Sequence, residues 1–533
     1  MVRNNLMKEK LEKLIKEVSG VENFTVEHPA DFKMGDYSTN VGIKTGKAKE
    51  IYDHLAVQPP SGVEKVELAG PGFINFYLSK EFFQNSLKEI IEKGENFGKS
   101  EHAKGFKVMV EHTDPNPFKE FHIGHLMPNV IGSTIARIFE WNGAQVKQAN
   151  YQGDVGLHVA KAVYRIKKGD DWKIAYANGD KDYRENLEAK KEIEEINKKI
   201  YEKSNPEINQ IYEKGLRESL EYFAMIYHSI GARFDFSFFE SETAEIGKKI
   251  VLDNLGKVFE ESEGAVVFKG SHTRVFINSH GLPTYEAKDL GNAQLKYKKY
   301  PYDLSVIVTA NEIKDYFKVV LEAMAKVLPD LANKTKHISH GILKLPTGKM
   351  SSRTGTVISA EELIEEVKTR TKGDEQVAIA AIKYMILRQS IGNDIIFDFE
   401  KSVSTEGDSG VYLQYAHARA CSVLGKSSSP AKGEMPKAEG VKPLPTLPLA
   451  GEGGTRIIER LLYRFPETVE RAGSEYAPNY ITTYLTELAA SFNNFYAQKQ
   501  IIGDDYRLAI TQAFKIVMKN GLNILGIAAP ERM

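Results

Sequence analysis

The chain has 533 residues, too many for one compact core, and at about 150 residues per domain it predicts roughly three to four domains. Hydrophobic residues make up 42% and charged residues 27% of it, the balance of an ordinary globular protein. With 71 basic against 72 acidic residues, the composition argues against a strongly basic nucleic-acid binder, although it allows a local basic face. The single cysteine, Cys421, excludes an internal disulfide and a cysteine-rich zinc site.

The hydropathy of the chain favours a protein that does not enter a membrane. No uninterrupted apolar stretch reaches the ~18 residues that a membrane span needs. The first residues, MVRNNLMKEKLEKL, are charged and lack the apolar segment of a signal peptide. We therefore expect a cytoplasmic protein with no membrane contact.

The first part of the chain predicts a small α+β domain that ends near residue 98. Residues 7–18 carry apolar side chains at helical spacing, and VEKVELAG at 63–70 predicts a strand. A Pro-Gly turn, the strand-like segment FINFYLS and a helix near 80–93 complete the domain.

A strand, a helix and a second strand follow, which is how a parallel nucleotide-binding sheet begins. KVMVEH at 107–112 predicts a buried strand, and residues 123–142 predict a helix that packs on a sheet. Charge-rich helices at 165–262 predict an insertion. Apolar segments then predict further strands at 265–270, 274–278 and 303–308.

The last part of the chain predicts helices. Residues 425–455 are rich in Pro, Gly, Ser and Lys and predict a loop, whereas 456–533 have helical periodicity. The expected fold class is α/β: a parallel-sheet core, interrupted by an insertion, between an N-terminal α+β domain and a C-terminal all-α domain.

The motif His122-Ile123-Gly124-His125 lies where the first helix of the predicted core begins. A helix N-terminus presents unpaired N–H groups and a partial positive charge, which together bind phosphate. Gly124 lets a nucleotide approach the backbone, and the two histidines, three residues apart, can both donate hydrogen bonds to phosphate oxygens. Chance alone gives such a tetrapeptide in about 2% of chains of this composition, so the motif needs support from a second one.

The second motif is Lys349-Met350-Ser351-Ser352-Arg353, in the loop LPTGKMSSRTGT. A lysine and hydroxyls in a glycine-bounded loop can fold over a triphosphate and neutralise charge as pyrophosphate leaves. Alone, it suits a solvated basic loop equally well. Together the motifs predict the ATP-binding residues His122, Ile123, Gly124, His125, Lys349, Met350, Ser351, Ser352 and Arg353. The catalytic candidates among them are His122, Gly124, His125, Lys349 and Ser351.

The two motifs resemble the HIGH and KMSKS sequences of class I aminoacyl-tRNA synthetases, and their flanks resemble the arginyl-tRNA synthetases over essentially the whole chain. GDYSTN (35–40) and AGPGFINF (69–76) resemble the N-terminal domain that binds the tRNA elbow in that family. The other matching segments are VEHTDPNPFKEFHIGH, NYQGDVG, LPTYEAKDLG, STEGDSGVYLQYAHAR, YLTELAASFNNFY and NILGIAAPERM.

The resemblance implies a class I, Rossmann-like catalytic core and a C-terminal helical anticodon-binding domain. The parts that we expect are, in order, the elbow-binding domain, the first core half, the insertion, the second core half, the KMSSR loop with its connecting helices, and the anticodon-binding domain. They span residues 1–98, 99–164, 165–262, 263–345, 346–410 and 411–533.

The resemblance also implies an arginine pocket. A guanidinium is planar with five donors, so a selective site needs carboxylates in its plane and an aromatic face. By resemblance, Glu111 and Asp289 bind the guanidinium, Tyr285 packs against the side chain, and Asn116 holds the α-amino and carboxylate end. Without that resemblance, Tyr285 and Asp289, four residues apart, would also suit an ordinary pair on a helix surface.

Three positions depart from the family pattern. Ser352 replaces the second lysine of KMSKS, and the resemblance implies Lys119 as the catalytic substitute, with Arg353 as a second candidate. Val155 stands where the family has a tryptophan. Glu312 stands at the glutamine or histidine that contacts arginine, which leaves this contact open.

Three further residues match positions that touch the anticodon loop in the family: Tyr415, Arg419 and Met533. Stacking of an aromatic ring on an unpaired base contributes ~1–3 kcal/mol. For Tyr415 and Arg419, simple helix packing is the alternative. The expected partners are tRNA(Arg), L-arginine and ATP with Mg²⁺ on its phosphates, without a dedicated protein metal site, and we expect a monomer.

The reaction that the resemblance implies is attack of the arginine carboxylate on the α-phosphate of ATP, followed by transfer of arginine to the terminal adenosine of tRNA. Two alternatives remain. A free-standing nucleotidylyltransferase would not need residues 411–533. A catalytically silent RNA-binding paralogue would not need His122, His125 and Lys349.

Overall fold

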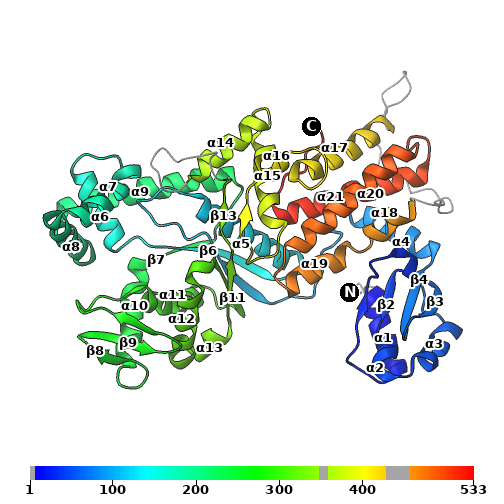
Figure 1. The fold of residues 1–533 in the computed structure, drawn as a ribbon, viewed down its shortest axis with the longest axis horizontal. Helices are drawn as coiled ribbons and strands as arrows, with labels where there is room; N and C mark the ends of the chain where they lie inside the picture. Colours follow the sequence, from blue (N-terminus) through cyan, green and yellow to red (C-terminus); the bar gives the residue numbers. More distant parts are fainter. Residues whose placement is uncertain (1–6, 347–357, 428–454) are drawn as a thin grey trace. The chain divides into compact units, whose positions relative to one another are not determined.

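The computed structural model describes residues 7–346, 358–427 and 455–533, which fall into two compact units (Figure 1). Unit 1 contains the two ends of the chain, and unit 2 contains its middle. Unit 1 spans residues 1–102, 404–475 and 480–533, and unit 2 spans residues 103–403 and 476–479. The six domain boundaries expected from the sequence stay predictions.

Unit 2 is built on a five-stranded sheet in which every neighbouring pair of strands is parallel. The strand order is β12 (Thr335–His340), β11 (Leu304–Ala310), β5 (Lys107–Glu111), β6 (Gln145–Gln152) and β7 (Phe236–Phe239). Val108, Met109 and Val110 in the central strand are fully buried, as expected for a strand covered on both faces. The parallel-sheet core predicted from the sequence is therefore confirmed.

Helix α5 (Ile123–Trp141) connects β5 to β6 and follows the loop that leaves the carboxyl end of β5. It is buried along most of its length, which agrees with its apolar sequence. In an open parallel sheet, ligands bind outside the carboxyl ends of the strands. The chain thus places the HIGH motif at this edge.

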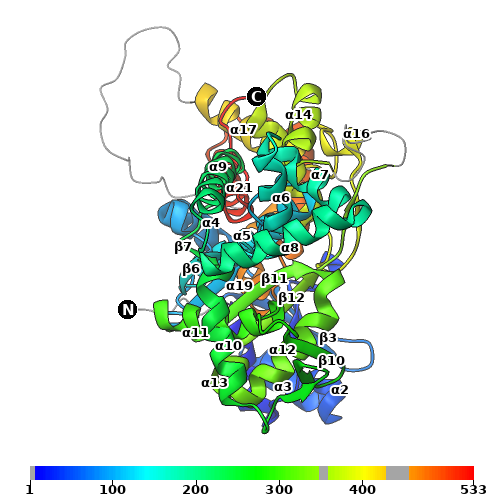
Figure 2. The ribbon, with the colours of Figure 1, turned by 90° about the vertical axis from the view of Figure 1, so that its left-hand side faces the viewer.

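A helical insertion separates β6 from β7. It consists of α6 (Leu157–Lys167), α7 (Trp172–Glu185), α8 (Leu187–Glu202) and α9 (Pro206–Ser229), which gather on the left of Figure 1 and also lie together in Figure 2. These helices share an apolar core with the loop after β5, through Phe118. The predicted insertion at 165–262 therefore contains one strand, β7, that belongs to the parallel sheet.

Two of the strands expected after the insertion do not join the parallel sheet. Strands β8 (Glu260–Ser262), β9 (Ala265–Lys269) and β10 (Thr273–Ile277) form an antiparallel sheet of their own. It shares an apolar core with three helices, α10 (Glu240–Asp253), α11 (Tyr285–Lys299) and α12 (Lys314–Val327). The short α13 (Pro329–Asn333) leads into β12.

The chain around the KMSSR motif closes unit 2. Strand β13 (Leu343–Lys344) precedes the motif and pairs with β14 (Ile395–Ile396). Helices α14 (Ala360–Arg370), α15 (Glu375–Leu387) and α16 (Phe399–Ser402) follow it. Within the described ranges, no helix is both long enough and apolar enough to cross a membrane.

Unit 1 combines a four-stranded antiparallel sheet with helices from both ends of the chain. The sheet order is β1 (Val26–Glu27), β2 (Tyr37–Thr39), β4 (Phe73–Leu78) and β3 (Val63–Ala69). The N-terminal helices are α1 (Met7–Ser19), α2 (Val41–Thr45), α3 (Ala48–Val57) and α4 (Lys80–Lys93). The C-terminal helices are α17 (Gly410–Ser427), α18 (Thr455–Leu462), α19 (Phe465–Ser474), α20 (Asn479–Gln498) and α21 (Asp505–Leu525).

Buried polar contacts join the two ends of the chain inside unit 1. Asp36, which is fully buried, forms an ion pair with Arg460 at 2.9 Å. His28 donates from Nε2 to Glu467 at 3.0 Å, and the hydroxyl of the buried Tyr37 donates to the same carboxylate. Asp36 and Tyr37 of the GDYSTN segment therefore hold the N-terminal sheet against α18 and α19.

Candidate active site

The two histidines of the HIGH motif form the N-cap of α5. The N–H of Gly124 donates to Nδ1 of His122 at 3.0 Å, and the N–H of His122 donates to Nδ1 of His125 at 3.2 Å. The two rings stack with their centroids 3.7 Å apart. A Cβ atom on Gly124 would lie 2.8 Å from the His122 ring, so the motif needs glycine at this position.

These contacts determine where each ring carries its proton. Because Nδ1 accepts a backbone N–H in both rings, the neutral rings hold their proton on Nε2. Burial, and next the positive charge of Lys119, lowers the pKa of His122 to about 4. Burial, then His122 and Lys119, lowers the pKa of His125 well below its usual value. Near pH 7 both rings are therefore neutral Nε2–H donors.

The KMSSR motif, with its predicted residues Lys349, Met350, Ser351, Ser352 and Arg353, lies outside the described residues. The chain that follows it is fixed beside the HIGH motif. The N–H of Ile123 donates to the carbonyl of Ile358 at 3.2 Å, and the N–H of Ala360 donates to the carbonyl of Phe121 at 2.9 Å. Ser359 thereby pairs with His122 in an isolated antiparallel bridge. The segment that begins at Ile358 is thus bonded to the start of the HIGH motif.

Three carboxylates meet at the carboxyl edge of the sheet. Glu111 ends β5, and its Oε2 contacts Lys296 Nζ at 2.8 Å. Asp289 accepts a hydrogen bond from the hydroxyl of Tyr316 at 2.5 Å. Asp114 accepts one from a backbone N–H of β6 at 2.8 Å.

The electrostatics of this cluster favour a cation. Burial raises the pKa of Asp289 to about 8, and the charge of Glu111 raises it further than the charge of Lys296 lowers it. Burial, and then Glu111, raises the pKa of Asp114 well above its usual value. Carboxyl groups that are forced to keep their protons at neutral pH need additional positive charge to ionise. A guanidinium placed among them would supply it.

The other predicted arginine-binding residues differ in how well they fit. Oδ1 of Asn116 accepts the N–H of Gly153 at 3.1 Å, which leaves its amide N–H groups for a carboxylate or phosphate oxygen. Tyr285 is the first residue of α11, one turn before Asp289, and is 55% exposed. Glu312 is exposed in a 3-10 turn after β11, and the described residues give it no hydrogen bond or ion pair.

Two of the predicted tRNA-binding residues are in contact in unit 1. The guanidinium of Arg419 lies 4.6 Å from the ring centroid of Tyr415 and 5.0 Å from that of Tyr496. Its Nη1 donates to Asn493 of α20, so part of its role is helix packing. Tyr415 keeps 37% of its surface exposed, and Met533 keeps 52%.

Comparison with known proteins decides the family. Residues 86–399 match the family of class I (R) tRNA synthetase catalytic domains. Residues 4–78 match the arginyl-tRNA synthetase N-terminal domain, and residues 413–533 match the DALR anticodon-binding domain. The chain belongs to the arginyl-tRNA synthetases.

Relatives agree over the whole length of the chain. The arginine–tRNA ligase of Archaeoglobus fulgidus is 30% identical, with 91% of each chain covered, and that of Treponema denticola is 29% identical, covering 96% of this chain and 95% of the relative. The solved arginyl-tRNA synthetase of Thermus thermophilus superposes with a TM-score of 0.75 at 25% identity, covering 99% of this chain and 100% of that one.

Sequence reasoning missed several residues of this synthetase's carboxylate cluster. Lys296 and Asn292, whose Nδ2 donates to Glu111 at 3.0 Å, follow Asp289 at spacings of seven and three residues on α11. That spacing places them on one helix face and could have revealed them. Asp114 lies in the same loop as Lys119, five residues before it, so its position in the sequence could also have indicated it. Tyr316 lies on another helix, α12, and nothing in the sequence indicates its contact with Asp289.

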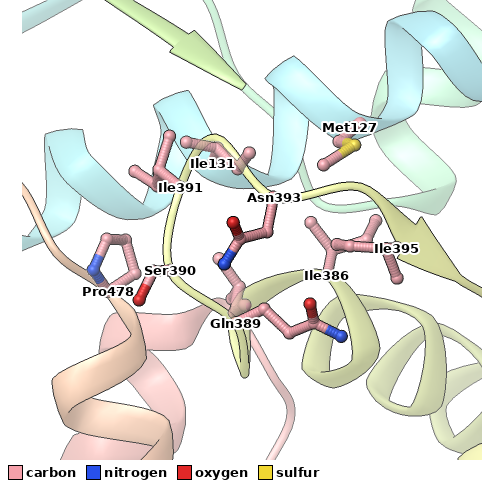
Figure 3. A pocket seen from close by; sticks show the side chains of 10 residues that line it. Met127, Ile131, Ile386, Gln389, Ser390, Ile391, Asn393, Ile395 and Pro478 are labelled. Carbon is pink, nitrogen blue, oxygen red and sulfur yellow. The ribbon is translucent and has the colours of Figure 1, made fainter. Parts of the chain in front are cut away.

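Unit 2 of the synthetase also has a small pocket that shares no residue with the candidate active site (Figure 3). It is lined mainly by apolar side chains of α5, α15 and the segment after α15, together with Pro478. None of its lining residues is a predicted site residue. The candidate active site is therefore the edge of the sheet.

Proposed function

We propose that the chain activates L-arginine with ATP and transfers it to tRNA(Arg), with both steps at the carboxyl edge of the five-stranded sheet. The observation that carries this proposal is the pair of neutral Nε2–H donors at the start of α5, beside a buried carboxylate cluster. The first feature suits phosphate and the second suits a guanidinium. Family membership supports the same assignment.

The arginine side chain enters the carboxylate cluster. Asp289 and Asp114 lose their protons as the guanidinium, which stays charged at all physiological pH values, takes the place of those protons. Glu111 is already paired with Lys296, so it contributes its second oxygen and its charge. Tyr285 covers the side chain, and the amide of Asn116 holds the α-carboxylate facing the nucleotide.

Adenylation follows by direct displacement at phosphorus. An oxygen of the arginine carboxylate attacks the α-phosphate of ATP, and the bond from that phosphorus to the bridging oxygen of the β-phosphate breaks, so that pyrophosphate leaves. The Nε2–H groups of His122 and His125 donate to phosphate oxygens as charge develops. Lys119 and Lys349 supply positive charge, and Mg²⁺ arrives on the phosphates of ATP.

Transfer completes the reaction. The 2′-hydroxyl of the terminal adenosine of tRNA attacks the activated carbonyl, AMP leaves, and the hydroxyl proton passes to the departing phosphate. Tyr415, Arg419 and Met533 bind the anticodon loop in this proposal. We also propose that the enzyme works as a monomer in the cytoplasm.

Arginine-dependent exchange of pyrophosphate into ATP, measured with and without tRNA, tests this function. We expect exchange with arginine and none with lysine or citrulline. Charging of tRNA should follow. Binding of tRNA without exchange under any condition would identify a silent RNA-binding protein. If the full-length chain does not charge tRNA and exchange persists after removal of residues 411–533, the result would favour a nucleotidylyltransferase.

A further inference from the structure

The part of the loop next to Lys119 is held by the helical insertion. Phe118 is fully buried with a φ of +65°, and its N–H donates to Oγ of Ser219 on α9 at 2.9 Å. Its ring stacks on Tyr212, and a Cβ atom on Gly215 would lie 2.3 Å from it. Helix α9 thus fixes the backbone one residue before Lys119.

A second insertion helix holds the end of the Lys119 side chain. The ammonium nitrogen lies 4.2 Å from the ring centroid of Tyr176 on α7. The described residues give it no carboxylate within ion-pair distance. Lys119 is close enough to the HIGH motif to lower the pKa of both His122 and His125. The ammonium is therefore held by an aromatic face, on a residue that precedes His122 by three positions.

A neighbouring lysine shows the alternative arrangement. Lys161 on α6 lies over the ring of Tyr183 at 4.4 Å, but it also forms an ion pair with Asp180 at 2.7 Å. A carboxylate partner neutralises a lysine and competes with any incoming phosphate. An aromatic face orients an ammonium without neutralising it. Of the two lysines, Lys119 is the one that the described residues leave without an ion-pair partner.

We propose that Tyr176 is a positioning residue for adenylation: its ring holds the Lys119 ammonium beside His122 and His125, ready for the triphosphate. The proposal rests on the role of Lys119 in the proposed function. A lysine on a flexible four-carbon stem samples many rotamers, so a favourable contact at its end raises the fraction of molecules in the reactive arrangement. The helical insertion thereby gains a part in catalysis.

A double-mutant cycle in the full-length protein tests this inference, with cognate tRNA present in every assay. Tyr176→Leu should lower kcat/KM for ATP in arginine-dependent exchange by ~10-fold. The KM for arginine should stay unchanged, and Tyr176→Phe, which keeps the π face, should stay within ~3-fold of the parent. In a Lys119→Ala background, Tyr176→Leu should have no further effect.

Tyr183→Leu is the matched control, because it removes a similar ring from the same helix over an already paired lysine. It should leave exchange within ~2-fold of the parent. If the leucine variant misfolds, Tyr176→Met repeats the test with a longer apolar side chain that also lacks a ring. Thermal melting of each variant checks its folding.

The outcomes separate the inference from the function on which it rests. Additive losses from Tyr176→Leu and Lys119→Ala, equal losses in Tyr176→Phe and Tyr176→Leu, or a faster Tyr176→Leu enzyme would each overturn the positioning role. If Lys119→Ala is severe and Tyr176→Leu is mild, only this inference fails. If Lys119→Ala itself keeps near-parental exchange, the proposed role of Lys119 fails as well.

Discussion

Arginine binding should release a proton from the carboxylate cluster, and this makes the affinity depend on pH. Asp289, whose pKa burial raises to about 8, is mostly protonated in the free protein at pH 7. A guanidinium cannot give up its own proton, so it binds the cluster productively only when the carboxyl group ionises. The affinity for arginine should therefore rise with pH until Asp289 is already ionised in the free protein.

The size of the effect follows from the pKa. With a pKa of about 8 in the free protein and an ordinary value in the complex, ~0.9 proton leaves for each arginine bound at pH 7. The dissociation constant should fall ~10-fold from pH 6 to pH 7 and level off above pH 8. Asp114, whose pKa is also raised, adds to the release in the same direction.

Isothermal titration of arginine at pH 7, in phosphate and in Tris, measures the released protons from the difference in apparent enthalpy. Asp289→Asn should weaken binding and remove most of the buffer dependence. Asp330→Asn is the control, because it removes an exposed carboxylate on α13, outside the cluster. A dissociation constant that does not change between pH 6 and pH 8, with no buffer dependence, would refute the reasoning.

Further predictions concern three other positions. His125→Ala removes a donor to the phosphate and should lower arginine-dependent exchange at least ~100-fold, with little change in the KM for arginine. Burial lowers the pKa of His158 to about 3. Below about pH 6.5 the imidazole therefore takes up a proton in the unfolded chain but not in the folded one, and the free energy of unfolding should fall by ~1.4 kcal/mol per pH unit. His158→Gln should flatten that dependence in urea titrations at pH 5 and pH 7. Asp36→Asn leaves Arg460 buried without its charge partner and should cost ~3 kcal/mol in the same assay, and a loss below ~0.5 kcal/mol would contradict the contact.

The parts of the fold that sequence could predict are those that local pattern determines. The apolar run of β5 and the helical period of α5 locate the first strand and helix of the core. Strand β7 is only four residues long and follows charged helices, so nothing along the chain separates it from the insertion. Strands β9 and β10 look apolar enough for the core sheet, but they connect through a short turn that favours an antiparallel pair.

The same distinction applies to the candidate site. His122 and His125 are readable because helix geometry fixes their relation over three residues. The contact between Tyr316 and Asp289 depends instead on how α12 and α11 pack beside the sheet, which no spacing in the sequence records. The contact of Lys119 with Tyr176 joins the loop between β5 and α5 to one helix of the insertion, α7, and the sequence gives no sign of it for the same reason.

The loop between β5 and α5 connects the charge-rich insertion to the candidate active site. Thr113, Asp114 and Phe118 have φ values of +83°, +42° and +65°, a backbone region in which each side chain costs ~1–3 kcal/mol. Such a loop keeps its shape only if its surroundings hold it. The backbone N–H of Tyr151 bonds Asp114 from the sheet, and Ser219 bonds Phe118 from the insertion. The core thus offsets the strain at one end of the loop, and the insertion helices offset it at the other. Loss of the insertion contacts should therefore affect nucleotide binding before it affects arginine binding.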